Sequence, residues 1–205
     1  MKAITIKKIS LLITIFAVAL TSCIRERDLR YDAALLEPEV QNVDLMIAYQ
    51  VPAGYKMVSQ GFTDSIARAE LAANPFTEKR VTIFVDTLIG NSTICLYDMR
   101  ALPYERTEDR LDFYFSTYNA NGQWESIEKN TFRHGDFKQI TELDMVNTST
   151  DRRLLKYYFY EDGKAQFSID YYFRNSYYND LKPYIESSLA SVKKNHEIII
   201  ELLDQ

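Results

Sequence analysis

Few side chains in this sequence have the type and spacing that catalysis or metal binding requires. The two histidines, His134 and His196, lie far apart along the chain. His134 stands in FRHGDF, which is typical of a turn, and no further ligands follow at the spacing that a zinc site needs. The sequence contains no G-x-S-x-G, H-E-x-x-H, phosphate-binding loop or G-x-G-x-x-G pattern. It therefore predicts no catalytic residue, no metal and no cofactor. An enzyme whose catalytic residues come together only in the folded chain is the alternative.

The two cysteines, Cys23 and Cys95, have different surroundings. Cys95 lies in TICLYD, a run typical of a strand, with no histidine or lysine close in sequence to lower the pKa of its thiol. We expect it to be a buried and unpaired small hydrophobe. A reactive thiol is the alternative.

The chain begins MKAITIKKISLLITIFAVALTSC, and this stretch is typical of an export signal. Three lysines precede the apolar run Ile9–Leu20, which is 20 − 9 + 1 = 12 residues long. A helix needs about 20 apolar residues to span a bilayer, so this run fits a cleaved signal peptide better than a membrane anchor.

Leu20, Thr21, Ser22 and Cys23 resemble the bacterial lipobox, an aliphatic residue and two small residues before an obligatory cysteine. The resemblance implies cleavage between Ser22 and Cys23, with diacylglycerol on the Cys23 thiol and an acyl group on its new amino terminus. Two or more acyl chains give stable anchoring. Because Ile24 is not the aspartate that retains lipoproteins at the inner membrane, we expect the outer membrane and a domain that faces the periplasm. An ordinary signal peptide that contains a cysteine is the alternative.

The composition fits one domain after the signal. Three lysines and no acid lie within residues 1–22, so the remaining 183 residues carry a net charge of about (24 − 3) − 29 = −8. Such an acidic chain argues against nucleic acid and against charge-driven docking on anionic lipid. We expect a signal peptide at 1–22, the lipidated cysteine and a tether at 23–43, and a single domain at 44–205.

Apolar periodicity and turn residues predict an α+β fold, an antiparallel β-sheet with helices packed on its faces. The expected strands are 44–52, 54–59, 80–88, 92–99, 126–132, 137–146, 154–161 and 164–173. The expected helices are 63–74, 105–119 and 176–193, and residues 195–205 fit a helix better than a strand.

The clearest element is the hairpin around Asp162-Gly163, a dipeptide typical of a two-residue turn. Pairing outward from this turn and alternating the faces predicts one apolar core face and one mixed face. Tyr157, Phe159 and Tyr172 are expected on the mixed face with Gln166, Ser168 and Asp170. The three aromatic residues are candidate binding residues if that face is open. The alternative is that the helix at 176–193 covers it.

The stretch VPAGYKMV and the segment from Tyr157 to Lys193, a hairpin that leads into a helix, resemble the PsbP-like superfamily. Its members include an extrinsic lumenal subunit of photosystem II and a nuclear-import factor that binds Ran. The resemblance implies an α/β/α sandwich and a binding or assembly role, and it carries over no catalytic residue.

Two functions of different classes fit these features. The first is a lipid-anchored interaction or assembly factor with a protein partner in the cell envelope. The second is a module that binds a small molecule or glycan at a tyrosine-rich site, since the chain has 15 tyrosines. A closed apolar pocket of about 300 Å³ or more would favour the second function, and a flat aromatic patch would favour the first.

Overall fold

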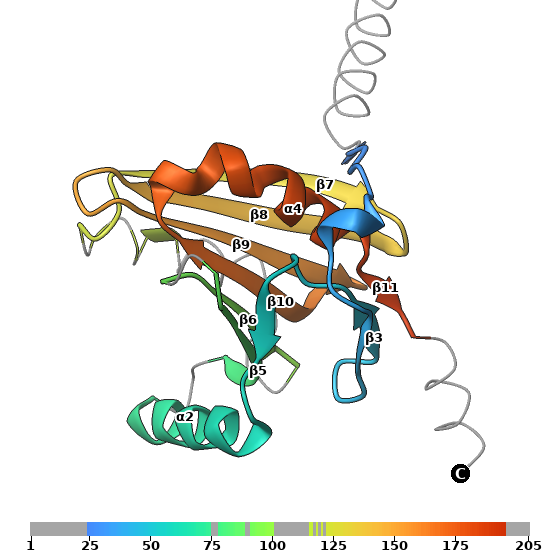
Figure 1. Cartoon of the computed structure of the whole chain (residues 1–205), viewed down its shortest axis with the longest axis horizontal. Coiled ribbons are helices and arrows are strands. Elements are labelled where there is room, and N and C mark those ends of the chain that lie inside the picture. Colours follow the sequence, from blue (N-terminus) through green and yellow to red (C-terminus); the bar gives the residue numbers. More distant parts are fainter. Residues whose placement is uncertain are drawn as a thin grey trace, which may run out of the picture.

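Eight strands form one strongly curved sheet in the order β1-β7-β8-β9-β10-β6-β5-β4 (Figure 1). The computed structural model describes residues 24–74, 78–88, 91–100, 115–116, 118, 120 and 122–195. The strands of this sheet are β1 (Arg25–Glu26), β4 (Tyr55–Met57), β5 (Lys79–Asp86), β6 (Thr93–Asp98), β7 (Ser126–His134), β8 (Phe137–Asn147), β9 (Arg152–Glu161) and β10 (Lys164–Phe173). Neighbouring strands are antiparallel except β1 and β7, which run parallel.

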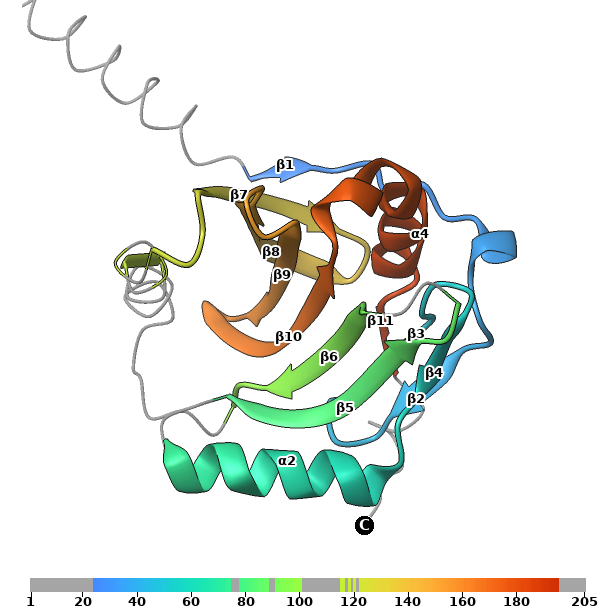
Figure 2. The same ribbon diagram turned by 60° about the vertical axis from the view of Figure 1, so that its left-hand side comes forward.

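A second, three-stranded sheet and two α-helices complete the described fold. The small sheet has the order β11-β3-β2, with β2 (Val40–Asn42), β3 (Ile47–Tyr49) and β11 (Lys193–Lys194). The helices are α2 (Gln60–Ala73) and α4 (Tyr178–Ala190), with short 3₁₀ turns η1 (Ala33–Leu35) and η2 (Asn175–Tyr177). Figure 2 shows α4 inside the concave face of the curved sheet and α2 outside, against β5.

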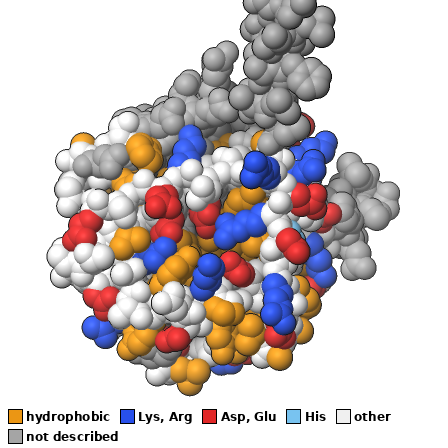
Figure 3. Space-filling view, turned by 90° about the horizontal axis from the view of Figure 1, so that it is seen from above, with side chains coloured by type: hydrophobic (Ala, Val, Ile, Leu, Met, Phe, Trp, Pro, Cys, Tyr) orange, Lys and Arg blue, Asp and Glu red, His pale blue; other side chains and the backbone are white. Residues whose placement is uncertain are grey.

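The concave face holds the larger hydrophobic core. Ile185 and Leu189 of α4 pack there against apolar side chains from β3 and from β5 to β10. The rings of Phe159 and Phe167 are stacked with their centroids 4.4 Å apart, and Phe137 meets Phe159 edge to face. Above this core, basic and acidic side chains are interspersed on the face that Figure 3 shows.

The convex face carries a second, smaller hydrophobic cluster. Its buried members are Met99, Trp124, Leu143, Met145, Tyr158, Tyr160 and Ala165, and Phe115, Tyr118 and Tyr172 pack at its margin. Both faces of β9 and β10 are therefore covered over most of their length. This explains why apolar and aromatic residues run almost continuously through these strands instead of alternating with polar ones.

A β-bulge between Ala165 and Phe167 overturns the expected sorting of faces in the hairpin. Ala165 pairs with Tyr160, but the next pair is Phe167 with Phe159. The extra residue, Gln166, shifts the following alternation by one, and a shift of one residue exchanges the two faces of a strand. Tyr157 and Phe159 therefore belong to the concave core, and the expectation that they share a face with Ser168, Asp170 and Tyr172 is wrong.

The expected tether at 23–43 is also wrong over its described part, because these residues are packed on the domain. Arg25 and Glu26 pair with β7, and Leu29 is buried in the concave core. The Arg27 guanidinium lies 3.0 Å from Glu142 and over the ring of Phe132. The charged residues of this segment suggested a solvated linker, but Glu26 and Arg27 pair with Arg133 and Glu142, more than a hundred residues away, and such pairs leave no local pattern in the sequence.

The α+β prediction is confirmed, with local differences. Helix α2 begins at Gln60 after Ser59, so Thr63, where the helix was expected to begin, is buried within it. All eight expected strands are present, with β3 and β4 shorter than expected. The expected helix at 105–119 falls mostly on residues outside the description, and the expectation for 195–205 lies outside it beyond Asn195.

Candidate functional site

Tyr157, Phe159 and Tyr172 do not form one surface. Tyr157 and Phe159 are 2 % and 1 % exposed, and both lie in the core beneath α4. The Tyr157 hydroxyl donates to the Glu142 carboxylate at 2.7 Å, and burial together with that carboxylate raises the pKa of Tyr157. Tyr172 lies on the other face of the sheet and is half-buried. The alternative expectation, that the helix at 176–193 covers these residues, therefore applies to Tyr157 and Phe159.

Tyr172 belongs to a row of cross-strand neighbours on the convex face, which we call the distal strip. Strand register places Tyr172 between Leu154 of β9 and Thr93 of β6, and the row continues through Val85 of β5 to Lys56 of β4. Leu154, Tyr172 and Thr93 are half-buried, while Val85 and Lys56 are exposed. The strip is thus an open edge of a face that is otherwise largely covered.

A hollow of about 560 Å³ adjoins the distal strip. It is lined by Asn91, Thr93, Thr150, Asp151, Arg152, Tyr172, Phe173 and Arg174. The Arg174 Nε donates to Asp151 at 3.0 Å, and the Asp151 carboxylate also accepts from the backbone and side chain of Ser176. These bonds lower the pKa of Asp151 and hold Arg174 at the rim. Arg152 is exposed, so the hollow combines an aromatic wall with accessible basic groups.

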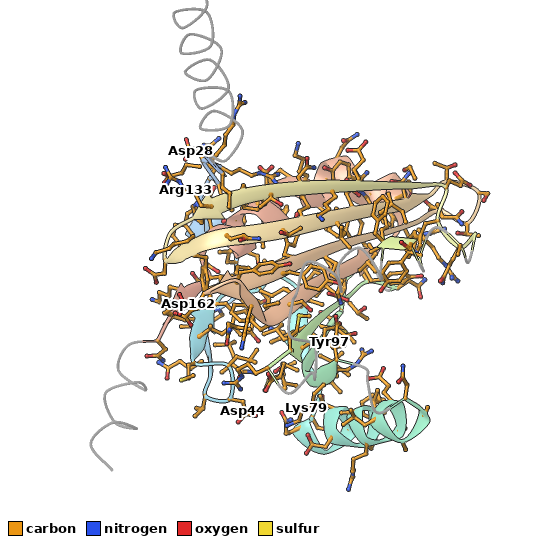
Figure 4. All side chains as sticks on the ribbon, turned by 180° about the vertical axis from the view of Figure 1, so that it is seen from behind. Asp28, Asp44, Lys79, Tyr97, Arg133 and Asp162 are labelled. Atoms are coloured by element: carbon orange, nitrogen blue, oxygen red, sulfur yellow. The ribbon has the colours of Figure 1, made fainter. Side chains whose placement is uncertain are left out.

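Along the convex face from Tyr172 lies a buried charged cluster centred on Lys156. The Lys156 Nζ is 2.6 Å from the Glu78 carboxylate and 3.1 Å from the Asp170 carboxylate. The rings of Tyr97 and Tyr158 lie 4.7 and 5.2 Å from the same nitrogen. Figure 4 labels Tyr97 on β6. The Lys156 side chain is 3 % exposed, so these contacts replace nearly all of its hydration.

Burial and charge act in opposite directions on this cluster. Burial raises the pKa of Asp170 to about 6, with Lys156 lowering it and Glu78 raising it further. Burial lowers the pKa of Lys156, but Asp170 and Glu78 outweigh burial and hold it well above its ordinary value. Lys156 is therefore charged at neutral pH, whereas Asp170 titrates just below neutral pH.

The three charged side chains of the cluster are buried, so none of them is open to a substrate. The structural effect of the cluster is clear, because Glu78 follows α2 and Lys156 and Asp170 lie on β9 and β10. One cation thus joins Glu78, which directly precedes β5, to the centre of the sheet. Sequence analysis missed this cluster. The available signal was a lysine within LLKYYFY and an aspartate within FSIDYYF, since charged residues are rarely buried unless they are paired.

The remaining candidate groups lie away from the distal strip. Cys95 is buried and free, as expected, and burial raises the pKa of its thiol even though Arg80 Nη1 lies 3.0 Å from the sulfur. His134 stands at the end of β7, as expected of a turn histidine, with Nδ1 3.2 Å from the Arg27 carbonyl oxygen. Ser22, Cys23 and His196 lie outside the described residues.

Within the described ranges, no three histidine, cysteine, aspartate or glutamate side chains converge in a way that could hold a metal ion. No described helix is both long enough and apolar enough to cross a membrane. An apolar cavity lies at the end of the sheet near β11, lined by residues that include Leu45, Phe137 and Phe167, and its volume is about 90 Å³. This is well below the size at which a closed apolar pocket would favour small-molecule binding, about 300 Å³.

Comparisons with known proteins show similarity at the level of structure. No protein-family model matches the chain, and no curated protein matches it in sequence. A solution structure of cyanobacterial PsbP (CyanoP) from Synechocystis sp. PCC 6803 is similar over 78 % of this chain and 93 % of that chain. The TM-score is 0.48 and the sequence identity is 12 %.

Proposed function

We propose that this chain is a lipid-anchored protein of the bacterial cell envelope that acts by binding a protein partner. The anchor is Cys23, the membrane is the outer membrane, and the domain faces the periplasm. The support for the anchor is the sequence of Leu20 to Cys23 behind a basic and then apolar segment. The support for binding is the distal strip, with its half-buried tyrosine beside accessible arginines.

The position of the distal strip relative to the amino terminus carries the proposal. Arg25 pairs with Phe132 of β7, whereas the row that contains Tyr172 and Leu154 crosses β7 at Ile127. The two rows are 132 − 127 = 5 residues apart, roughly 17 Å along the strand. An anchor before β1 therefore presents the distal strip at the end of the sheet that points away from the membrane.

The side chains at that end are of the types that dominate binding energy at protein interfaces. Tyrosine and arginine are enriched among such residues, and they act best where neighbouring contacts exclude water. Tyr172 is partly held by the convex cluster, so it loses little conformational freedom when a partner covers it. Arg152 and Arg174 lie at the rim of the same hollow, and they favour an acidic or polar segment on the partner.

Lipidation is tested by replacing Cys23 with serine and fractionating the cells. The wild-type chain is expected in the membrane fraction at the processed mass plus lipid. The Cys23→Ser chain should not gain lipid and should leave the membrane fraction. A Cys23→Ser chain that remains membrane-bound at the processed mass would contradict the anchor.

Partner binding is tested by chemical crosslinking in native membranes, followed by recovery of the protein with its partners. Tyr172→Ala should reduce recovery of a partner, since losing a dominant contact costs about 2 kcal/mol, or roughly 30-fold in Kd. Tyr31→Ala is the matched control, because Tyr31 is 52 % exposed and outside the strip. Equal recovery with both variants, at unchanged thermal stability, would rule out the distal strip as the binding site.

The second function, binding of a small molecule or glycan, has one observation in its favour. The hollow of about 560 Å³ beside Tyr172 falls in the size range of ligand sites, about 300–1,000 Å³. Its polar lining suits a hydroxyl-rich ligand stacked on the tyrosine ring. A glycan array probed with the purified protein and with Tyr172→Ala distinguishes this function, because specific binding that the substitution abolishes would support it.

A further inference from the structure

The described fold begins directly after the proposed lipidation site. Ile24 is its first residue, and Arg25 and Glu26 already form β1 against β7. Consecutive Cα atoms are about 3.8 Å apart, so a lipid on Cys23 has almost no tether. The end of the sheet that carries β1 must then lie at the membrane surface. Figure 4 shows Arg133, Asp28 and Asp162 at this end.

A polar hollow of about 300 Å³ opens at the same end, which we call the anchor-side pocket. It is lined by Ile24, Asp136, Lys138, Gln139, Tyr160, Glu161, Asp162, Gly163 and Lys194. These residues come from the amino-terminal segment, the β7–β8 turn and β8, β9 and the β9–β10 turn, and β11. Segments far apart in the sequence thus converge beside the residue that follows Cys23.

The anchor-side pocket carries charges of both signs. Its two lysines and three acidic residues sum to 2 − 3 = −1. Lys194 is already engaged, because its Nζ pairs with Glu161 and its backbone N–H donates to Asp136 at 3.1 Å. Lys138 is exposed and forms no ion pair with any described residue. An anionic headgroup would meet a slight excess of negative charge, whereas a zwitterion could satisfy both signs.

We propose that the anchor-side pocket binds the headgroup of a zwitterionic phospholipid, one with a phosphate and a primary amine. The phosphate contacts Lys138, and the ammonium group contacts the carboxylates of Asp136 and Asp162. This assignment rests on the proposed lipidation of Cys23, which brings the pocket to the bilayer. Headgroup binding would fix the orientation of the domain on the membrane and hold the distal strip outward.

The test uses the full-length protein purified in detergent and titrated with phosphatidylethanolamine, with bound lipid counted by native mass spectrometry. One phosphatidylethanolamine should bind per chain. Lys138→Gln should weaken this binding about 10-fold, as expected for one charge-assisted hydrogen bond. Lys182→Gln is the matched control, because Lys182 is an exposed lysine of α4 outside the pocket. Phosphatidylglycerol, an anionic lipid, should bind about 10-fold more weakly than phosphatidylethanolamine.

The same spectra separate failure of this inference from failure of the proposed anchor. The mass of the chain reports directly whether Cys23 carries lipid, whatever else is bound. The proposal of a zwitterionic headgroup is wrong if phosphatidylglycerol binds as tightly as phosphatidylethanolamine. It is also wrong if inorganic phosphate binds at the same site with the same affinity. Unchanged binding by Lys138→Gln would remove the anchor-side pocket as its site.

Discussion

Replacing Lys156 with methionine keeps the length of the side chain but removes the one cation between two buried carboxylates. The Nζ contacts of 2.6 Å to Glu78 and 3.1 Å to Asp170 would be lost, and both acids would remain under the convex face. Deleting one partner of a buried ion pair costs about 3–5 kcal/mol. We expect Lys156→Met to lower the free energy of unfolding at pH 7 by about that amount.

The pH dependence gives this prediction its direction. In the wild-type protein the pKa of Asp170 is about 6, compared with an ordinary value of 3.8. The folded chain therefore holds this proton more tightly than the unfolded chain. The stabilisation from Asp170 is complete below pH 4 and is lost as the pH rises through 6, a change of about 3 kcal/mol. Without Lys156 the pKa of Asp170 rises further. Lys156→Met should therefore lower the free energy of unfolding by less at pH 5 than at pH 7.

Urea denaturation of both proteins at pH 5 and pH 7 measures these differences directly. The double variant Lys156→Met/Asp170→Asn should recover part of the loss at pH 7, because asparagine replaces a buried carboxyl group that has lost its cation. A loss below about 0.5 kcal/mol, or the same loss at both pH values, would show that the cluster does not stabilise the fold through charge pairing.

Three further predictions follow from described contacts. Tyr157→Ala should lower the free energy of unfolding by about 3–5 kcal/mol in urea denaturation, because its ring is buried beneath α4; a change below about 0.5 kcal/mol would contradict that burial. Cys95 should react with a maleimide only in denaturant, since its thiol is buried and the pKa is raised, and rapid labelling of the folded protein would contradict this. Gly163 has a φ of 77°, so Gly163→Val should cost about 1–2 kcal/mol, whereas Gly61→Val, at a negative φ, offers a comparison without that backbone penalty.

The hairpin shows both the reach and the limit of sequence reasoning for this chain. The dipeptide Asp162-Gly163 correctly locates the turn, and pairing outward from it correctly places Glu161 opposite Lys164. The bulge after Ala165 left no sign in the sequence, because Gln166 fits a continuous strand as well as a bulge. Alternation that ignores the bulge places Tyr172 on the same face as Tyr157, whereas the structure places the two residues on opposite faces of the sheet.

The other features that the sequence does not predict, the packed amino-terminal segment and the Lys156 cluster, have a different cause. They depend on contacts between residues distant in sequence. Leu29 is buried in the concave core together with residues of α4 and the curved sheet, although the residues around it in sequence are charged. Glu78 directly precedes β5, Lys156 lies on β9 and Asp170 lies on β10, so only the completed sheet brings them together. Local periodicity predicts elements and their types, whereas these sites depend on the order in which strands pair.

The packing of the amino-terminal segment also constrains when the molecule can finish folding. Arg27 contacts Glu142, 115 residues later, and the Asp32 backbone bonds to Ser187, 155 residues later. Closing such long loops is entropically costly and slow compared with forming the hairpins of β7 to β10. This amino-terminal segment of the fold is therefore among the last parts to be fixed, once α4 has formed. Until then the segment from Arg25 to Asp32 is not held against the sheet, so it would be accessible to the enzymes that the proposed lipidation of Cys23 requires.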